Sequence, residues 1–179
     1  MASIAFTINP RIVRNGGPIT SDVYKSHATT LWLKGTLLKF ASGLLTPVVD
    51  TKSGAAEIDT DDTGTAVQLF VALEDHIVAG TDFVAVQEIL SDTVLEMQLC
   101  ASSTTSPATA AVTAGTSYAG YQLQNASYEG SGLVALDVDD TTTPVFRVVE
   151  VSSNYKPFTN TTTKEYAKVL VKVLPTIVA

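Results

Sequence analysis

Short apolar runs of strand length, each ended by turn-forming residues, are the feature that most constrains the fold of this chain. Val, Ile, Leu, Thr, Tyr and Phe dominate the runs, and clusters of Gly, Pro, Asn, Asp and Ser separate them. Apolar residues at the period of an amphipathic helix are scarce. The pattern therefore predicts an all-β fold, either a small β-barrel or a β-sandwich.

Side-chain alternation is clearest in the run before the single cysteine. Leu95, Met97 and Leu99 fall on one face of this run, and Glu96 and Gln98 fall on the other. The runs predicted to be strands are Ser3–Ile8, Thr29–Lys34, Thr36–Ala41, Ala66–Leu73, Phe83–Ile89, Thr93–Cys100, Tyr118–Leu123, Leu133–Val138, Val145–Val151 and Tyr166–Val173.

The turn signals also predict the domain organisation. Lys34–Val48 has the pattern of a hairpin that turns at Ala41–Gly43. The segment 101–114 contains only Ala, Ser, Thr, Val and one Pro, which is typical of a loop or linker. We therefore expect a barrel or sandwich domain over residues 27–179, with a loop or linker near 101–116, preceded by an extended N-terminal arm over residues 1–26.

The predicted arm combines apolar and basic residues. Its first strand contains Ile4, Phe6 and Ile8, and helix- and strand-breaking residues follow around Arg11 and Arg14. An isolated arm cannot bury its own apolar side chains, and addition to a sheet edge of a neighbour is a common means of burying them. These five residues are the predicted partner-binding residues. The alternative is that the segment is an ordinary edge strand of the domain.

Charge is segregated along the chain. The first 52 residues hold six bases and two acids, a net charge of +4. From Ser53 to Phe146 there are fourteen acids and no Lys or Arg, whereas the part from Arg147 onward has a net charge of +3. An acidic segment of this size repels phosphate, so we do not expect the chain to bind nucleic acid. The basic ends are suited to an acidic partner, or they neutralise the acidic middle within one fold.

Residue patterns typical of enzymes are missing from the sequence. GxSxG, HExxH, GxxxxGK[ST] and CxxC do not occur. Cys100 lies in an apolar run that would raise its pKa, and His27 and His76 have no neighbouring ligand pattern, so a surface position is expected for His76. We predict that the protein is not an enzyme and has no catalytic, cofactor-binding or metal-binding residues. No signal peptide or run of membrane-span length is apparent.

Two weaker patterns point to ligands. The acidic clusters Glu57–Gly64 and Asp137–Thr143 contain hard oxygen ligands suited to calcium, although Asp-rich turns between strands are common for local reasons. Tyr118, Tyr121 and Tyr128 surround a Gly-containing region and, if exposed, would favour a glycan-binding surface.

Several segments, taken in order, resemble the small β-barrel decoration or cement proteins of tailed bacteriophage capsids. Gly35–Val48 is similar to the opening hairpin of those proteins. Phe70–Asp75 and Phe83–Val86 are similar to their central strand pair, and Asp92–Glu96 and the later run Gly120–Leu123 extend the likeness. The resemblance covers roughly residues 35 to 150.

The resemblance implies a structural virion protein on the outer surface of a capsid. Such a protein, as a homotrimer, would cement neighbouring subunits of the major capsid protein, and the arm would reach a capsid subunit. Neither nucleic acid nor membrane would be a partner. The alternatives are a phage tail or fibre component, and a carbohydrate-binding β module that uses the tyrosines named above.

Overall fold

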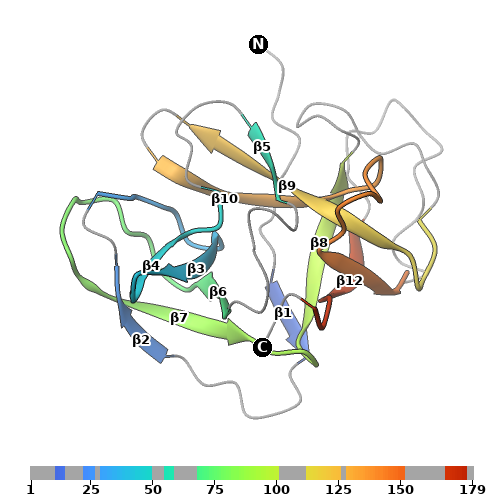
Figure 1. Ribbon diagram of the computed structural model, residues 1–179, viewed down its shortest axis with the longest axis horizontal. Helices are drawn as coiled ribbons and strands as arrows, with labels where there is room; N and C mark the ends of the chain where they lie inside the picture. The colour runs from blue at the N-terminus through green and yellow to red at the C-terminus, as the bar shows by residue number, and fades with distance from the viewer. Residues whose placement is uncertain are drawn as a thin grey trace.

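The computed structural model describes residues 11–14, 22–26, 29–49, 55–58, 68–100, 112–125, 128–151 and 168–176. These residues form strands, turns and loops that build two sheets (Figure 1). The predicted all-β class is confirmed. Since the described residues contain no helix, none of them forms a helical membrane span.

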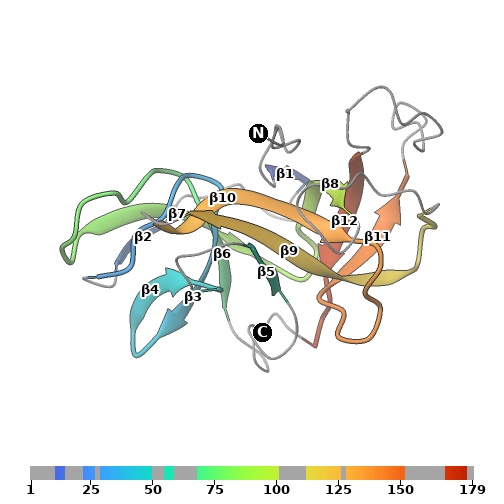
Figure 2. The same cartoon turned by 90° about the horizontal axis from the view of Figure 1, so that it is seen from above.

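The first sheet closes into a barrel, which we call the C-terminal barrel. Strand β8 pairs in parallel with β10 and antiparallel with β12 on its other edge, and antiparallel pairs β10–β9, β9–β11 and β11–β12 complete the ring. Figure 2 shows β9 and β10 as two long neighbouring strands. The ring strands are β8 (Val94–Cys100), β9 (Ser117–Asn125), β10 (Tyr128–Asp137), β11 (Phe146–Glu150) and β12 (Lys168–Val173).

Two short strands extend this sheet. Strand β1 (Arg11–Arg14) pairs with β8 through Arg11 opposite Glu96 and Arg14 opposite Val94. Strand β5 (Ala55–Ile58) pairs with β9 over Leu123 to Gly120. Strands β8 and β9 therefore each pair with two strands, one after the other, along one edge. The partners of β8 on that edge are β1 and β10, and those of β9 are β5 and β11.

The second sheet, which we call the N-terminal sheet, has the order β2-β7-β6-β3-β4. It curls until its two edges meet, because Ser26, directly after β2, forms a parallel bridge with Leu45 of β4. All its neighbouring strands are antiparallel. The strands are β2 (Asp22–Lys25), β3 (Leu37–Ala41), β4 (Leu44–Pro47), β6 (Leu69–Ala72) and β7 (Phe83–Ile89).

The predicted hairpin within Lys34–Val48 is confirmed as β3 and β4. Its two turn residues, Ser42 and Gly43, have φ values of 53° and 79°. Positive φ at both central positions is the geometry of a two-residue turn that matches the twist of antiparallel strands. Glycine adopts this conformation without steric cost, which explains the Ser-Gly pair at the tip.

Alternating side chains of the N-terminal sheet serve two cores. One face surrounds a small core within the curled sheet, and Tyr24 and Phe40 pack against it. The other face contributes Leu37, Val71 and Ile89 to the core shared with the C-terminal barrel. The two sheets are therefore joined by common apolar packing. The small core contains Trp32, Leu38, Leu45, Phe70, Ala72, Val84 and Val86.

The C-terminal barrel has a mostly aliphatic interior. Leu95, Met97 and Leu99 of β8 lie in it, as the alternation predicted, together with Val169 and Val171 of β12. All seven residues of β8 are buried, so its second face, with Glu96 and Gln98, is also covered.

The strand predicted over Thr29–Lys34 is wrong. Only Trp32 makes a β-bridge there, with His76, and the chain then turns at Lys34 and Gly35. Gly35 has a φ of 88°, and Asp75 accepts a hydrogen bond from the Lys34 backbone N–H at 2.7 Å. The apolar segment 29–34 therefore buries the Trp32 side chain and does not form a continuous strand.

The predicted arm is also changed. Arg11–Arg14 and Asp22–Ser26 belong to the two sheets, so the described part of segment 1–26 is paired with the body. Residues 1–10 lie outside the described residues, as does most of the predicted linker. The described residues 112–116 of that linker directly precede β9. The Gly115 N–H donates a hydrogen bond to the carbonyl of Val148 in β11.

Candidate interaction surface

The predicted partner-binding residues do not form one described site. Arg11 and Arg14 are in β1, where their backbones pair with the edge of β8. Ile4, Phe6 and Ile8 lie outside the described residues. The described residues instead include other strongly exposed apolar side chains, which the sequence analysis did not single out.

These side chains lie around strands β2 and β7. Among the described residues, the large hydrophobic side chains most exposed to solvent are Val78 at 70%, Phe83 at 67%, Val23 at 58% and Ile77 at 50%. Val23 and Phe83 come from neighbouring strands, and Ile77 and Val78 belong to the loop that precedes β7. We call these four residues and Lys25 the β2–β7 surface.

Strand alternation explains why apolar residues of β2 and β7 face outward. Tyr24 and Val84 point to the small core, so Val23 and Phe83 point away from it. Lys25 lies directly opposite Phe83 in the antiparallel register. Its ammonium group is 5.5 Å from the centroid of the Phe83 ring, which is a cation–π contact. The surface is therefore apolar, and Lys25 adds one positive group beside Phe83.

The loop at the edge of this surface is tied to the sheet. Ser26 donates its backbone N–H to the Asp82 carbonyl at 2.8 Å and its hydroxyl to the Gly80 carbonyl at 3.3 Å. The same hydroxyl accepts a hydrogen bond from the Asp82 N–H at 3.0 Å. At the other end, Trp32 and His76 exchange two backbone hydrogen bonds of 2.9 Å. Ile77 and Val78 are thus held between two anchored points.

A rigid exposed surface loses little conformational entropy when a partner covers it. Burying apolar side chains of this size gives a favourable contribution of about 25 cal/mol for each Å² removed from water. The β2–β7 surface is therefore suited to stable contact with a complementary protein face.

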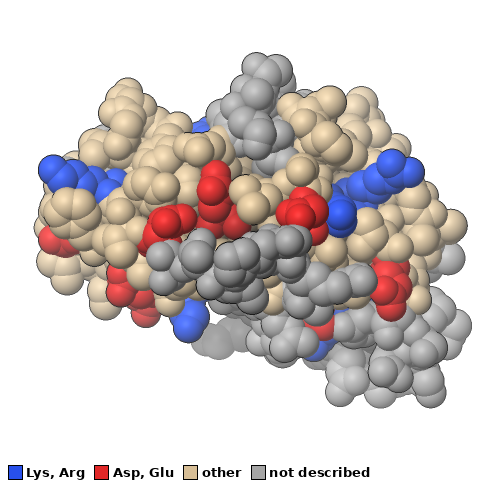
Figure 3. Space-filling view, turned by 90° about the horizontal axis from the view of Figure 1, so that it is seen from below, with Lys and Arg blue, Asp and Glu red and all other residues tan. Residues whose placement is uncertain are grey.

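The charge distribution around the molecule is uneven. On the face shown in Figure 3, carboxylates spread across the middle, and most of the Lys and Arg atoms lie nearer to two sides. The acidic middle of the sequence is not entirely solvated, because Glu96 and Asp137 are buried.

His76 does not lie at the surface, so that prediction is wrong. It is 4% exposed, and its ring stacks against Trp32 with centroids 4.6 Å apart. The neighbouring acids are used elsewhere: Glu74 accepts a hydrogen bond from the Ala85 N–H at 2.6 Å, and Asp75 accepts one from Lys34. His27 lies outside the described residues.

Cys100 is buried, as predicted. Burial raises the pKa of its thiol far above the ordinary value, and the negative charges of Asp137 and Asp139 add to this effect. The thiolate form is therefore disfavoured, which is the reverse of what a nucleophile needs.

The two weaker ligand patterns have different outcomes. Tyr118 is buried in the C-terminal barrel at 6% exposure, so the predicted exposed tyrosine cluster is wrong at this residue. Asp137 and Asp140 accept hydrogen bonds from the N–H groups of Asp139 and Thr142, two residues further along the chain. No group of three His, Cys, Asp or Glu residues in the described part of the chain is arranged to hold a metal ion. The cluster at Glu57–Gly64 falls largely outside the described residues.

The β2–β7 surface had only a weak signal in the sequence. Val23 lies in a four-residue strand, and Phe83 begins a predicted strand whose inward face was not determined by its composition. The signal that was available is the position of Lys25 two residues after Val23, because a lysine marks the outward face of a strand.

Comparison with known proteins gave no match to a protein family, to a curated protein sequence or to a solved structure.

Proposed function

We propose that this chain is a structural, non-enzymatic virion protein that binds the outer surface of a tailed-phage capsid and cements neighbouring major capsid subunits. The observation on which the proposal depends most is the exposed, anchored β2–β7 surface. Val23, Phe83, Ile77 and Val78 are its apolar contacts, and Lys25 is its basic contact.

The segments that resemble capsid decoration proteins support this choice of surface. Gly35–Val48 spans β3 and β4, Phe70–Asp75 begins in β6, and Phe83–Val86 lies in β7. All three therefore belong to the N-terminal sheet, which also bears the β2–β7 surface. The remaining likeness extends into β8 and β9 of the C-terminal barrel, so it covers both halves of the molecule.

The handling of reactive groups also favours a structural role. His76 is packed against Trp32, and the Cys100 thiol is buried with a raised pKa. Such groups stabilise a scaffold and are poorly placed for chemistry with a substrate. The burial of Tyr118 removes one member of the surface on which a carbohydrate-binding module would depend.

Electron microscopy of phage particles mixed with the purified protein tests the proposal. Particles of the phage that encodes the chain are prepared without it, mixed with the purified protein and imaged. We expect a regular arrangement on the outer capsid lattice at positions shared by neighbouring major capsid subunits, with trimeric protein at each position. Binding to the tail or to fibres alone, or absence of binding, would contradict the capsid assignment.

Substitutions and a deletion test which part of the protein contacts the capsid. Phe83→Ser combined with Val23→Ser removes the centre of the β2–β7 surface and should weaken capsid binding about tenfold or more, since exposed aromatic anchors dominate interfaces. Leu90→Ser is the matched control, because Leu90 is exposed but lies at the other end of β7. Deletion of residues 1–10 measures the part of the predicted arm that precedes β1. Equal loss in the double variant and the control would contradict the assigned surface.

A further inference from the structure

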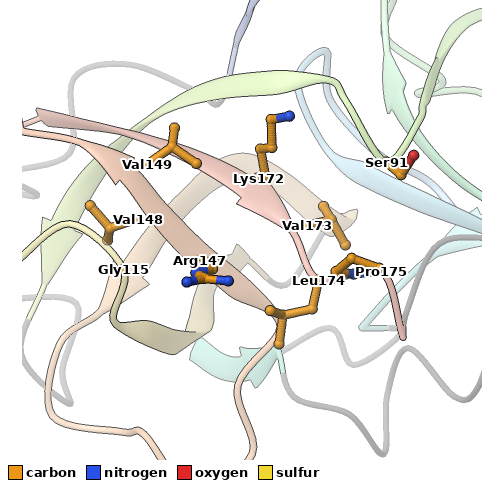
Figure 4. A pocket seen from close by; sticks show the side chains of 9 residues that line it. All are labelled: Ser91, Gly115, Arg147, Val148, Val149, Lys172, Val173, Leu174 and Pro175. Carbon is orange, nitrogen blue, oxygen red and sulfur yellow. The ribbon is translucent and has the colours of Figure 1, made fainter.

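A pocket on the C-terminal barrel has two cationic side chains in its lining, and in Figure 4 the Lys172 ammonium and the Arg147 guanidinium point in different directions. Its volume is about 410 Å³, and strands β11 and β12 form much of its wall. Arg147 is exposed and Lys172 is half-buried. The lining residues are Ser91, Gly115, Arg147, Val148, Val149, Lys172, Val173, Leu174 and Pro175.

The two cations lie directly opposite each other on neighbouring strands. Arg147 of β11 is the register partner of Lys172 of β12 in the antiparallel pair. Like charges at directly opposed positions of a sheet destabilise it. The described lining residues include no Asp or Glu, so no carboxylate among them neutralises the pair. Anionic groups bound at the two side chains would remove this repulsion.

The rest of the lining determines which anion fits. Val149, Leu174 and Pro175 supply apolar contacts beside the two charges. The guanidinium of Arg147 passes close to the turn at Gly115, where its Nη2 atom is 4.0 Å from the position that a Cβ would take. The turn is therefore within van der Waals range of the guanidinium, and the φ of 95° at Gly115 favours glycine there. The pocket combines two positive groups with an apolar wall.

We propose that this pocket binds an acidic peptide segment of a partner protein. One carboxylate of the segment binds Arg147 and a second binds Lys172, and an apolar side chain of the same segment packs against Leu174 and Val149. Arginine binds a carboxylate with two parallel hydrogen bonds, and lysine adds a point charge. A nucleic acid is a poorer occupant, because the net charge of −7 on the whole chain repels a polyanion.

This site goes beyond the proposed capsid attachment and does not depend on it. The two surfaces are on different sheets and use different chemistry. Capsid binding through the β2–β7 surface can fail while the peptide binds, and the reverse outcome is equally measurable.

NMR titration of the labelled full-length protein tests the site. The probe is a blocked tetrapeptide of alternating leucine and glutamate, and the matched probe replaces each glutamate with glutamine. We expect the glutamate peptide to shift amide signals of β11 and β12 and to bind at least tenfold more tightly than the glutamine peptide. Equal binding of the two peptides, or no binding, would overturn the proposal.

Variants separate the pocket from general electrostatic attraction. Arg147→Met combined with Lys172→Met should weaken binding of the glutamate peptide about tenfold or more, without a lower midpoint of thermal unfolding, because a repulsive pair has been removed. Lys34→Met removes an exposed cation elsewhere and should leave the affinity unchanged. Equal effects of these variants would overturn the assignment. Stronger shifts of the same amides by inorganic phosphate or a short single-stranded oligonucleotide would also overturn it.

Discussion

The N-terminal sheet and the C-terminal barrel close in different ways and fill their interiors with different side chains. The N-terminal sheet meets itself through one bridge, Ser26 with Leu45, and its core contains a tryptophan and a phenylalanine. The C-terminal barrel closes through continuous pairing of β8 with β12, and its core is mostly aliphatic. Backbone pairing thus contributes more to closure in one half, and aromatic packing contributes more in the other.

The aromatic packing is specific. Phe70 lies at the centre of a cluster in which its ring is 5.1 Å from Phe40 and 5.3 Å from Tyr24, measured between centroids. Tyr24 and Phe40 are themselves in edge contact at 5.0 Å. Tilted and edge arrangements of this kind are favoured by the aromatic quadrupole. The cluster joins the side chains of β2, β3 and β6 and so adds to the single bridge that closes the two edges of the sheet.

The largest expected loss of stability comes from a substitution in this aromatic cluster. Phe70→Ala removes a fully buried ring and should lower the free energy of unfolding by about 3–5 kcal/mol. Chemical denaturation followed by circular dichroism measures the loss. Phe83→Ala is the matched control, because its ring is exposed, and it should change stability by less than about 0.5 kcal/mol.

Phe70→Ala also tests whether the halves unfold together. Leu37, Val71 and Ile89 of the N-terminal sheet share a core with the barrel. We therefore expect one cooperative unfolding transition in the unchanged protein and in the Phe70→Ala variant. Two separate transitions would show that the shared core does not couple the halves.

A second prediction concerns charge on the outer face of the barrel. Lys168 and Lys172 share one face of β12. The Lys168 Nζ atom is 3.9 Å from the buried carboxylate of Glu96, whereas Lys172 lies opposite Arg147 of β11. Lys168→Met should therefore destabilise by about 1–3 kcal/mol, because a buried carboxylate loses a positive neighbour. Lys172→Met should cause no loss. Equal unfolding midpoints for the two variants in urea would contradict this account of the pair.

A third prediction uses the buried thiol of the barrel. The pKa of Cys100 is raised in the folded protein, so above the ordinary thiol pKa the unfolded chain releases a proton that the folded chain retains. Stability contributed by the neutral thiol is complete below that value and is lost as the pH rises beyond it. We expect a loss of about 1 kcal/mol for each pH unit in this range.

The measurement is urea unfolding between about pH 8 and pH 10, compared with Cys100→Ala. The variant is less stable at every pH, but the part of the slope that belongs to the thiol should vanish. An unchanged slope in the variant would show that other groups cause the pH dependence.

The smallest expected effect concerns the hairpin tip of the N-terminal sheet. Gly43 has a φ of 79° and no atom within 4 Å of the position of an added Cβ. Gly43→Ala should therefore cost about 1 kcal/mol through backbone conformation alone, without a clash. Gly43→Asn should cost less, since asparagine tolerates this conformation better. Thermal unfolding of the two variants measures the difference, and equal losses would indicate that the turn rearranges.

Strong alternation and turn chemistry allowed much of the framework to be predicted. The strand Phe83–Ile89 has the predicted bounds, and the hairpin turns at Ser42 and Gly43. The prediction missed β1, β2 and β5, each of four residues. Strands this short contain too few alternating positions for a pattern, and they are stabilised chiefly by the longer strands with which they pair.

The amino-acid sequence by itself determined the all-β class, the hairpin, the burial of Cys100 and the segregation of charge. Only the tertiary structure decided that His76 packs inside, that Tyr118 belongs to a core and that Val23 and Phe83 face outward. It also decided that Arg147 and Lys172 line one pocket. The physical reason is that local pattern specifies which residues share a face of a strand, whereas burial and proximity depend on the partner strands that cover that face.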